Sequence, residues 1–233
     1  MRGPTEFDQF ADNYDECLNQ ALAASGEGKE YFARGRVEWL ARCLGEDRPR
    51  PRSVLDYGCG TGDTATLLRE LLQSESVLGL DVSQRSLERA ERDHGSSTCR
   101  FIKFSEYQPD GSVDLAYCNG VFHHIPVGER AAAVDYIYRC LQPGGIFALW
   151  ENNPWNPGTR YVMYRCDFDR DAVKLSPTEA AGLLRNGGFE VLRTDYRFFF
   201  PRFLKALRSM ETWLSRVPLG GQYQVLVRKP SRK

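Results

Sequence analysis

Short apolar runs alternate with longer amphipathic stretches from residue 53 onward. The apolar runs are rich in β-branched residues and predict strands at 53–57, 77–81, 99–104, 113–118 and 145–150. The amphipathic stretches predict helices near 62–73, 84–94 and 127–141. Strands that alternate with helices form a parallel sheet with right-handed crossovers. The pattern therefore predicts a doubly wound α/β core.

Further elements flank this core. Apolar residues recur at helical spacing from 37 to 44 and stop at Gly45, which predicts a helix before the first strand. The capping pattern that begins at Ser176 predicts a helix over 177–186. The runs 189–200 and 222–229 predict a final antiparallel strand pair, with a helical insertion between them.

The composition narrows the kind of partner. Lys and Arg together number 31, as do Asp and Glu, so no overall basic excess indicates nucleic acid or an anionic membrane surface. The acidic amino-terminal segment is not a secretory signal, and no run of about 18 apolar residues predicts a membrane span. The seven cysteines form no CxxC pair, which indicates reduced thiols of a cytoplasmic protein and no zinc site. We expect a small-molecule partner and no nucleic acid.

The stretch VLDYGCGTGD places Gly58, Gly60 and Gly62 directly after the first predicted strand. In a doubly wound sheet this turn borders the ligand crevice, and glycines let a ligand approach the backbone. The amides that open the following helix attract a carboxylate or a phosphate. Asp81 ends the second predicted strand, where such folds bind ribose hydroxyls. These features fit a nicotinamide dinucleotide as well as an adenosyl ligand.

The glycine spacing separates these two ligands. The dinucleotide pattern GxGxxG would place its third glycine at position 63, which is Asp63. The chain instead has GxGxG and, further along, GLDVS, VDLAYCNGVFHHI and LQPGGIFAL. Together these motifs resemble the class I S-adenosylmethionine-dependent methyltransferases, in their ubiquinone-type and natural-product branch, over about residues 7–229. The resemblance implies a Rossmann-like, mostly parallel seven-stranded sheet with an antiparallel final strand, and S-adenosylmethionine as cofactor.

The resemblance also implies a set of cofactor-binding residues. They are Tyr14 as a lid residue, Asp56, Gly58, Gly60 and Gly62 along the cofactor, Asp81 on the ribose, Val82 on the adenine, Ser105 or Glu106 near its amino group, and Asn119 and Gly120 beside the sulfonium. Purely structural roles stay open, because a glycine can serve a plain turn and Tyr14 can pack its helix on the sheet.

The candidate catalytic groups follow the fourth and fifth predicted strands. Methyl transfer to a hydroxyl needs a base, and His123 and His124 stand where the methyl group would emerge. Adjacent side chains usually point apart, so one imidazole is expected to face the substrate, and we prefer His123 as the base. The resemblance leaves a structural role open, because one histidine of such a pair is often hydrogen-bonded to nearby backbone. Glu151 could orient a histidine, bind a substrate hydroxyl, act as the base itself, or be an ordinary acid at a strand end. We expect no metal.

The segment after Glu151 is the candidate acceptor wall. Its large side chains are Trp155, Tyr161, Tyr164 and Phe168, and the aromatics at 198–200 and Trp213 could add to it or belong to a core or an interface. We expect one domain with a helical lid at 1–50, a cofactor-binding core at 51–150 and acceptor-covering elements at 151–233.

The expected reaction is methylation of a hydroxyl of an aromatic, polyketide or quinol-like metabolite. Methylation of carbon or nitrogen on a small molecule and a noncatalytic cofactor-binding subunit are the alternatives. Asp63 and the PGG turn at 143–145 disfavour an NAD-dependent oxidoreductase.

Overall fold

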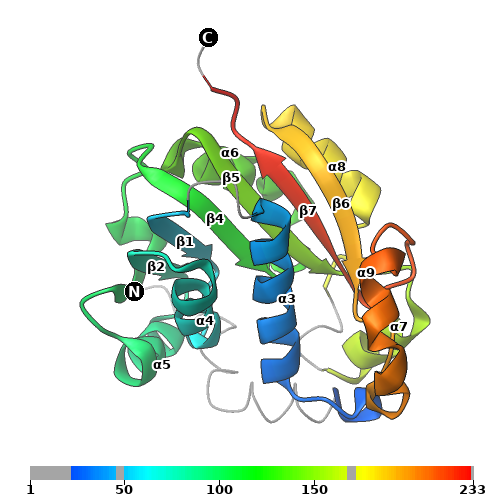
Figure 1. Cartoon of the computed structure of the whole chain (residues 1–233). Coiled ribbons are helices and arrows are strands. Elements are labelled where there is room, and N and C mark those ends of the chain that lie inside the picture. Colours follow the sequence, from blue (N-terminus) through cyan, green and yellow to red (C-terminus); the bar gives the residue numbers. More distant parts are fainter. Residues whose placement is uncertain (1–21, 46–49, 167–171, 232–233) are drawn as a thin grey trace.

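A single seven-stranded sheet forms the centre of this computed structural model, which describes residues 22–45, 50–166 and 172–231 (Figure 1). The strands are β1 (Ser53–Tyr57), β2 (Ser76–Asp81), β3 (Cys99–Lys103), β4 (Val113–Asn119), β5 (Leu141–Asn152), β6 (Glu190–Arg197) and β7 (Gln222–Arg228). Their order is β3-β2-β1-β4-β5-β7-β6, with β1 to β5 parallel and β7 antiparallel to both of its neighbours. The predicted sheet and its final antiparallel pair are confirmed.

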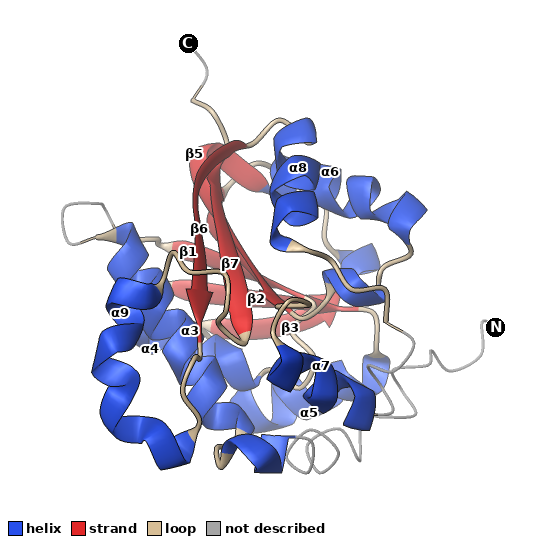
Figure 2. Ribbon diagram, turned by 90° about the vertical axis from the view of Figure 1, so that its right-hand side faces the viewer, coloured by secondary structure: helices blue, strands red, loops and turns tan. Residues whose placement is uncertain are grey.

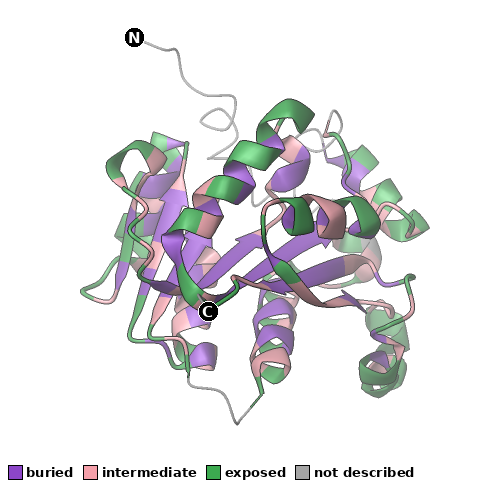
Figure 3. Ribbon diagram, turned by 90° about the horizontal axis from the view of Figure 1, so that it is seen from above, coloured by how far each residue is buried: buried purple, intermediate pink, exposed green. Residues whose placement is uncertain are grey.

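Helices cover both faces of the sheet. On one face lie α3 (Lys29–Leu44), α4 (Asp63–Leu72) and α5 (Gln84–His94), and on the other lie α6 (Arg130–Cys140) and α8 (Pro177–Asn186) (Figure 2). Seen from above, the buried strands lie between two layers of helices whose outer faces are exposed (Figure 3). The doubly wound α/β architecture is therefore confirmed.

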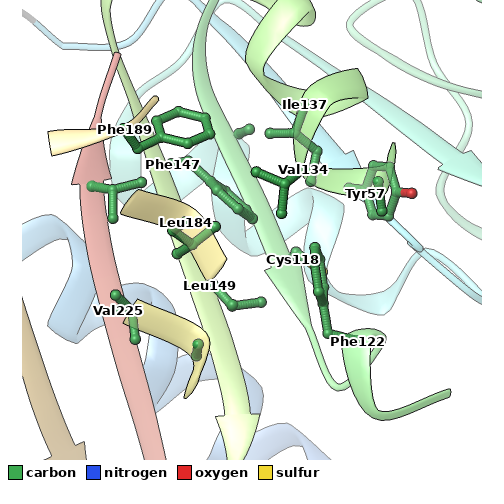
Figure 4. Packing of buried hydrophobic residues seen from close by; sticks show 14 of the residues in the cluster. Tyr57, Cys118, Phe122, Val134, Ile137, Phe147, Leu149, Leu184, Phe189 and Val225 are labelled. Atoms are coloured by element: carbon green, nitrogen blue, oxygen red, sulfur yellow. The ribbon is translucent and has the colours of Figure 1, made fainter. Parts of the chain in front are cut away.

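The strand sequences divide between the two layers because successive side chains point to opposite faces of a sheet. In β5, Ile146, Ala148 and Trp150 belong to the core beneath α3, α4 and α5, whereas Phe147 and Leu149 belong to the core beneath α6 and α8. Figure 4 shows the second core, built from strand residues and from the apolar faces of these two helices. Strands that are buried on both faces account for the nearly continuous apolar runs of the sequence.

Two elements differ from the prediction. Strand β5 begins at Leu141, earlier than the predicted position 145, because Leu141 pairs with Val113 of β4. Helix α7 (Pro157–Arg165) lies inside the candidate acceptor wall, for which no helix was predicted. The Asn156 side chain accepts a hydrogen bond from the Thr159 amide, and Pro157 opens the helix. These two residues, which are also common in turns, here form the helix cap. The predicted insertion before β7 contains the 3₁₀ helix η6 (Arg202–Met210) and α9 (Glu211–Leu214).

Within the described ranges, no helix is both long and apolar enough to cross a bilayer. The cysteines in these ranges are all free thiols.

Candidate active site

The glycine turn between β1 and α4 is held against the end of β2. Gly58, Gly60 and Gly62 all have positive φ angles, of 74°, 53° and 81°. The amides of Gly58 and Cys59 donate to the carbonyl of Leu80 at 2.8 and 3.0 Å. These bonds fix the turn in one position at the carboxyl edge of the parallel strands.

The three glycines meet different surroundings. A Cβ atom on Gly58 would lie 2.4 Å from the Val121 side chain, and one on Gly62 would lie 2.9 Å from both Ala90 and Phe101. A Cβ atom on Gly60 would meet nothing within 4 Å. Packing therefore requires the first and third glycines, whereas the space above Gly60 is open to a ligand.

Asp81 connects the end of β2 to the glycine turn. Its Oδ2 atom accepts a hydrogen bond from the Gly60 amide at 2.8 Å, and its Oδ1 atom accepts one from the Ser83 amide at 2.9 Å. The side chain is half-buried, and a carboxylate oxygen can accept more than one hydrogen bond, which is the chemistry that binds ribose hydroxyls. Val82, the next residue, is 50% exposed and presents an apolar surface beside it.

Asp56 lies beneath the turn and is only 2% exposed. Its Oδ2 atom has no hydrogen-bond partner among the described residues. Burial and the nearby Asp81 charge raise the pKa of Asp56 to about 7, while Arg36 opposes that increase. A buried carboxyl group with an unused oxygen is suited to a cationic ligand group, because pairing would offset the cost of burial.

His123 and Glu151 form a buried pair where β4 and β5 end. Their Nδ1 and Oε2 atoms lie 2.5 Å apart, and the residues are 3% and 1% exposed. The Oε1 atom of Glu151 accepts a hydrogen bond from the Phe122 amide at 2.8 Å. We assign the proton of the neutral ring to Nδ1, which donates to Oε2 of Glu151, and the lone pair to Nε2. Four roles were considered for Glu151, and this contact corresponds to the one in which it orients a histidine.

Arg130, at the start of α6, holds the two chain segments next to this pair. The Arg130 guanidinium donates to the carbonyls of Ile125 at 3.1 Å and Val173 at 2.6 Å, and the Val173 amide donates to the His123 carbonyl at 3.0 Å. The half-buried His124 ring packs on the more deeply buried His123 ring, with centroids 4.1 Å apart, so the expectation that the two side chains point apart is wrong. These contacts give the His123 ring a defined position.

The other predicted residues occupy the same edge of the sheet. Asn119 ends β4, and the Gly120 amide donates to the Trp150 carbonyl at 2.9 Å. Ser105 and Glu106 are exposed on the 3₁₀ helix η2 (Phe104–Glu106), directly after β3. The parallel ladder brings the carboxyl ends of β1 to β5 together, as the pattern predicted. Tyr14 and Phe168 lie outside the described residues.

Three polar contacts near the site escaped the sequence analysis. Arg36 of α3 is buried and donates to the Tyr117 hydroxyl at 3.1 Å, and Tyr117 is the β4 neighbour of Asp56 in the sheet. Asp63 accepts a hydrogen bond from the Thr61 hydroxyl at 2.7 Å and pairs with Lys29 at 2.9 Å. No sequence motif marks Arg36, because its position in a helix resembles that of any charged surface residue.

Comparisons with known proteins identify the family. A family model described as "Methyltransferase domain" matches residues 54–145. A probable S-adenosylmethionine-dependent methyltransferase of Mycolicibacterium smegmatis is 30% identical over 191 residues, which cover 76% of this chain and 69% of that protein. The chain belongs to the S-adenosylmethionine-dependent methyltransferases.

Other similar methyltransferases match with different coverage. Trans-aconitate 2-methyltransferase of Acidovorax sp. (strain JS42) is 31% identical over 116 residues, which span 50% of this chain and only 43% of that relative. A solved S-adenosylmethionine-dependent methyltransferase of Archaeoglobus fulgidus superposes with a TM-score of 0.66 at 16% identity, covering 87% of this chain and 95% of its own. This second likeness supports the methyltransferase fold.

S-adenosylmethionine, the cofactor of this family, fits the residues at the edge of the sheet. The unused Oδ2 atom of Asp56 suits an ammonium group, and the space above Gly60 admits a ligand against the backbone. Asp81 has lone pairs for ribose hydroxyls, and the exposed Val82 suits the face of an adenine ring. The donors, acceptors and apolar surface match the parts of this cofactor.

Proposed function

We propose that this chain methylates a hydroxyl group of a small aromatic, polyketide or quinol-like molecule, with S-adenosylmethionine as the donor and His123 as the general base. The observation that carries the proposal is the buried contact between His123 Nδ1 and Glu151 Oε2, 2.5 Å apart at the ends of β4 and β5. In this proposal the pair supplies an oriented base; the structural alternative is that it only joins the ends of β4 and β5.

Residues of β1, β2 and the turn between β1 and α4 bind the cofactor in this proposal. Asp81 accepts from the ribose hydroxyls, Asp56 pairs with the ammonium group, and Val82 contacts the adenine. Asn119 and Gly120 border the reacting end. When bound, the cofactor supplies an activated methyl group on a sulfonium centre. The protein aligns the acceptor with that group and excludes water.

His123 activates the acceptor. Its Nε2 atom would take the proton of the hydroxyl, and the bound cofactor would supply the methyl group, whose bond to sulfur breaks as the bond to the acceptor oxygen forms. Glu151 keeps the ring in the tautomer that has a basic Nε2, and its negative charge stabilises the imidazolium that results. Proton transfer to a positioned base contributes about 10²–10⁴ to a rate.

The need for a base distinguishes acceptor classes. Trans-aconitate, named for one relative, is a carboxylic acid, and an ionised carboxylate can accept a methyl group without losing a proton. The buried His123–Glu151 pair favours an acceptor that must lose one. A hydroxyl meets that condition and is the acceptor that we propose; an amine and an acidic C–H group also lose a proton on methylation and are the alternatives.

We assign the acceptor wall to α7 and the turn before it. These elements follow Glu151 along the chain and expose Trp155, Tyr161 and Tyr164. Aromatic side chains of this kind can pack on a planar acceptor. The cofactor-binding core at 51–150 and the acceptor-covering elements at 151–233 keep their predicted roles in this proposal. Within the predicted lid at 1–50, α3 packs on the sheet with Val37 and Leu40 fully buried and so belongs to the core of the domain.

A mass-spectrometric screen tests this function. The full chain is incubated with S-adenosylmethionine and a panel of hydroxylated aromatics, polyketides and quinols, beside carboxylic acids and amines of similar size. We expect one or more hydroxylated compounds to gain a single methyl group. A chain that binds the cofactor but methylates only acids or amines, or nothing, would contradict the proposal; the last result would favour the noncatalytic subunit.

A further inference from the structure

An exposed row of large apolar side chains lies on η6 and α9. Phe203 is 79% exposed and Trp213 is 85% exposed, and Leu204, Leu207 and Met210 between them are exposed as well. This outer helical segment lies beside α3 and β6, on the opposite face of the sheet from α6 and α8 (Figures 1 and 2). Single exposed apolar residues are ordinary, but five within eleven positions form a patch.

The large apolar side chains lie on the outer side of the segment. Leu207 and Met210 follow the three-residue period of the 3₁₀ helix, whereas Leu204 lies at a kink and Trp213 lies in α9. All four are exposed, while Arg208 and the buried Glu211 are turned towards the domain. Phe203 adjoins the start of this row. We call the surface formed by residues 202–213 the amphipathic face.

The segment is firmly attached to the rest of the domain. The Arg208 guanidinium pairs with Glu27 at 2.9 Å and lies over the Tyr31 ring, 4.4 Å from its centroid. The buried Glu211 accepts hydrogen bonds from the Phe199 and Phe200 amides at 3.1 and 3.2 Å. The apolar row is therefore presented by an anchored element, and not by a frayed end.

The exposed charges on the segment itself have one sign. Arg202 and Lys205 are exposed on it. Arg216, which follows the segment, pairs with Asp195 at 3.7 Å, and Arg208 pairs with Glu27 at 2.9 Å. Glu211 is the only acid between residues 198 and 221, and it is buried. The chain as a whole has no net charge, so this local basic character does not show in the composition.

We propose that the amphipathic face docks this protein onto the surface of an anionic lipid bilayer. Phe203 and Trp213 would enter the interface between headgroups and acyl chains, where aromatic side chains are favoured. Arg202 and Lys205 would meet the lipid phosphates. The proposal does not depend on the function proposed above, because docking needs neither cofactor nor acceptor.

A second copy of the chain fits this surface less well. Pairing the amphipathic face with itself would bring together two basic segments, and the exposed residues of neither supply an acid. An anionic bilayer complements both the apolar row and the charge. The observations therefore favour the lipid surface.

Sedimentation of the full chain with lipid vesicles tests the proposal. We expect binding to phosphatidylcholine vesicles that contain about one third phosphatidylglycerol, and at least about 10-fold weaker binding to pure phosphatidylcholine. The double variant Phe203→Ser/Trp213→Ser should lose at least about 10-fold in binding, and Lys205→Glu should weaken binding to the anionic vesicles. Val127→Ser, which changes an exposed apolar residue elsewhere, is the matched control and should bind as the unchanged chain does.

The tryptophan fluorescence of the unchanged chain gives a second test, which does not depend on whether a variant folds. Binding should move the emission of the exposed Trp213 to shorter wavelength, and Trp213→Phe should remove that change. Circular dichroism checks that each variant is folded. Absence of vesicle binding, equal binding to both vesicle types, or a concentration-dependent dimer that Phe203→Ser dissociates would overturn the proposal.

Discussion

His123 and Glu151 lie 28 positions apart in the sequence, yet their Nδ1 and Oε2 atoms are 2.5 Å apart and both residues are almost fully buried. Strands β4 and β5 are parallel neighbours, and Asn119 is aligned with Trp150. The two chain segments that leave these strands therefore start side by side. Each following prediction tests one part of the site built around this arrangement.

Replacing the proposed base should reduce turnover without removing the cofactor. In His123→Asn, the shorter amide can still donate to Glu151, but no basic nitrogen remains at the Nε2 position. We expect kcat/KM for a confirmed acceptor to fall about 10²–10⁴-fold, with the Kd for cofactor changed by less than about 3-fold. His124→Asn is the matched control and should have a smaller effect on turnover. Normal turnover in both variants would show that neither histidine acts as the general base.

Glu151→Gln should affect the same step through His123. A glutamine cannot accept hydrogen bonds at both of its terminal atoms, so either the His123 Nδ1–H or the Phe122 amide loses its partner. We expect a free energy of unfolding lower by about 1–3 kcal/mol, together with reduced kcat. Chemical denaturation and steady-state kinetics measure the two effects.

The double variant His123→Asn/Glu151→Gln separates the two roles. If Glu151 acts through His123, the double variant should turn over about as slowly as His123→Asn alone. Multiplied losses of turnover would show that Glu151 acts on the substrate independently.

The binding of cofactor should depend on the ionisation of Asp56. Its pKa is raised to about 7 by burial, so the free protein carries the neutral acid below that pH and the carboxylate above it. The carboxylate pairs with the cofactor ammonium, and so affinity should rise by about 10-fold from pH 6 to pH 8. Without ligand, the stability of the protein should change with pH in the opposite direction. The folded state holds the proton of Asp56 up to about pH 7, because a buried carboxylate is costly, whereas the unfolded state loses it at about pH 4. The free energy of unfolding should therefore fall as pH rises from about 4 to about 7.

Calorimetric titration of S-adenosylmethionine and its demethylated product between these pH values measures the affinity. Asp56→Asn removes the titrating group and should flatten the pH dependence. A profile for Asp56→Asn that runs parallel to that of the unchanged chain would show that another group is responsible.

Two glycine substitutions should separate ligand binding from folding. Gly60→Ala places its methyl group in open space, so we expect a small loss of stability, about 1–2 kcal/mol from the positive φ, and a loss of cofactor affinity of at least about 10-fold. Gly62→Ala has the same backbone cost and in addition forces the methyl group against Ala90 and Phe101. It should be the less stable of the two in thermal unfolding. Cofactor affinity unchanged in Gly60→Ala would show that the open space is not the binding site.

The core of the fold could be predicted because its signal is local. Each of β1 to β4 is an apolar run bounded by turn residues, and the helices between them carry one apolar face, so their limits agree with the structure within a few residues. Helix α7 could not be predicted, because Asn156 and Pro157 begin a helix as readily as they form a loop. The early start of β5 depends on its pairing with β4, which is a tertiary contact.

The sequence predicts where the site residues lie, at the ends of strands, but it does not predict which of them contact one another. Sequence motifs placed Asp81, Gly60 and Glu151 at strand ends, and parallel strands bring those ends to one edge. That Asp81 binds the Gly60 amide depends on the path of the turn, which periodicity does not determine. The burial of Asp56 beneath Arg36, which sets its pKa, also requires the packing of α3 on the sheet.

The position of the transferred methyl group tests the central claim most directly. The full chain is supplied with S-adenosylmethionine that carries a ¹³C-labelled methyl group and with the acceptor found by the screen, and the product is analysed by NMR. We predict a labelled methyl carbon bonded to oxygen at a former hydroxyl, formed by the unchanged chain and strongly reduced with His123→Asn. A label on nitrogen, on ring carbon or on a carboxylate, or equal product from His123→Asn, would contradict the account.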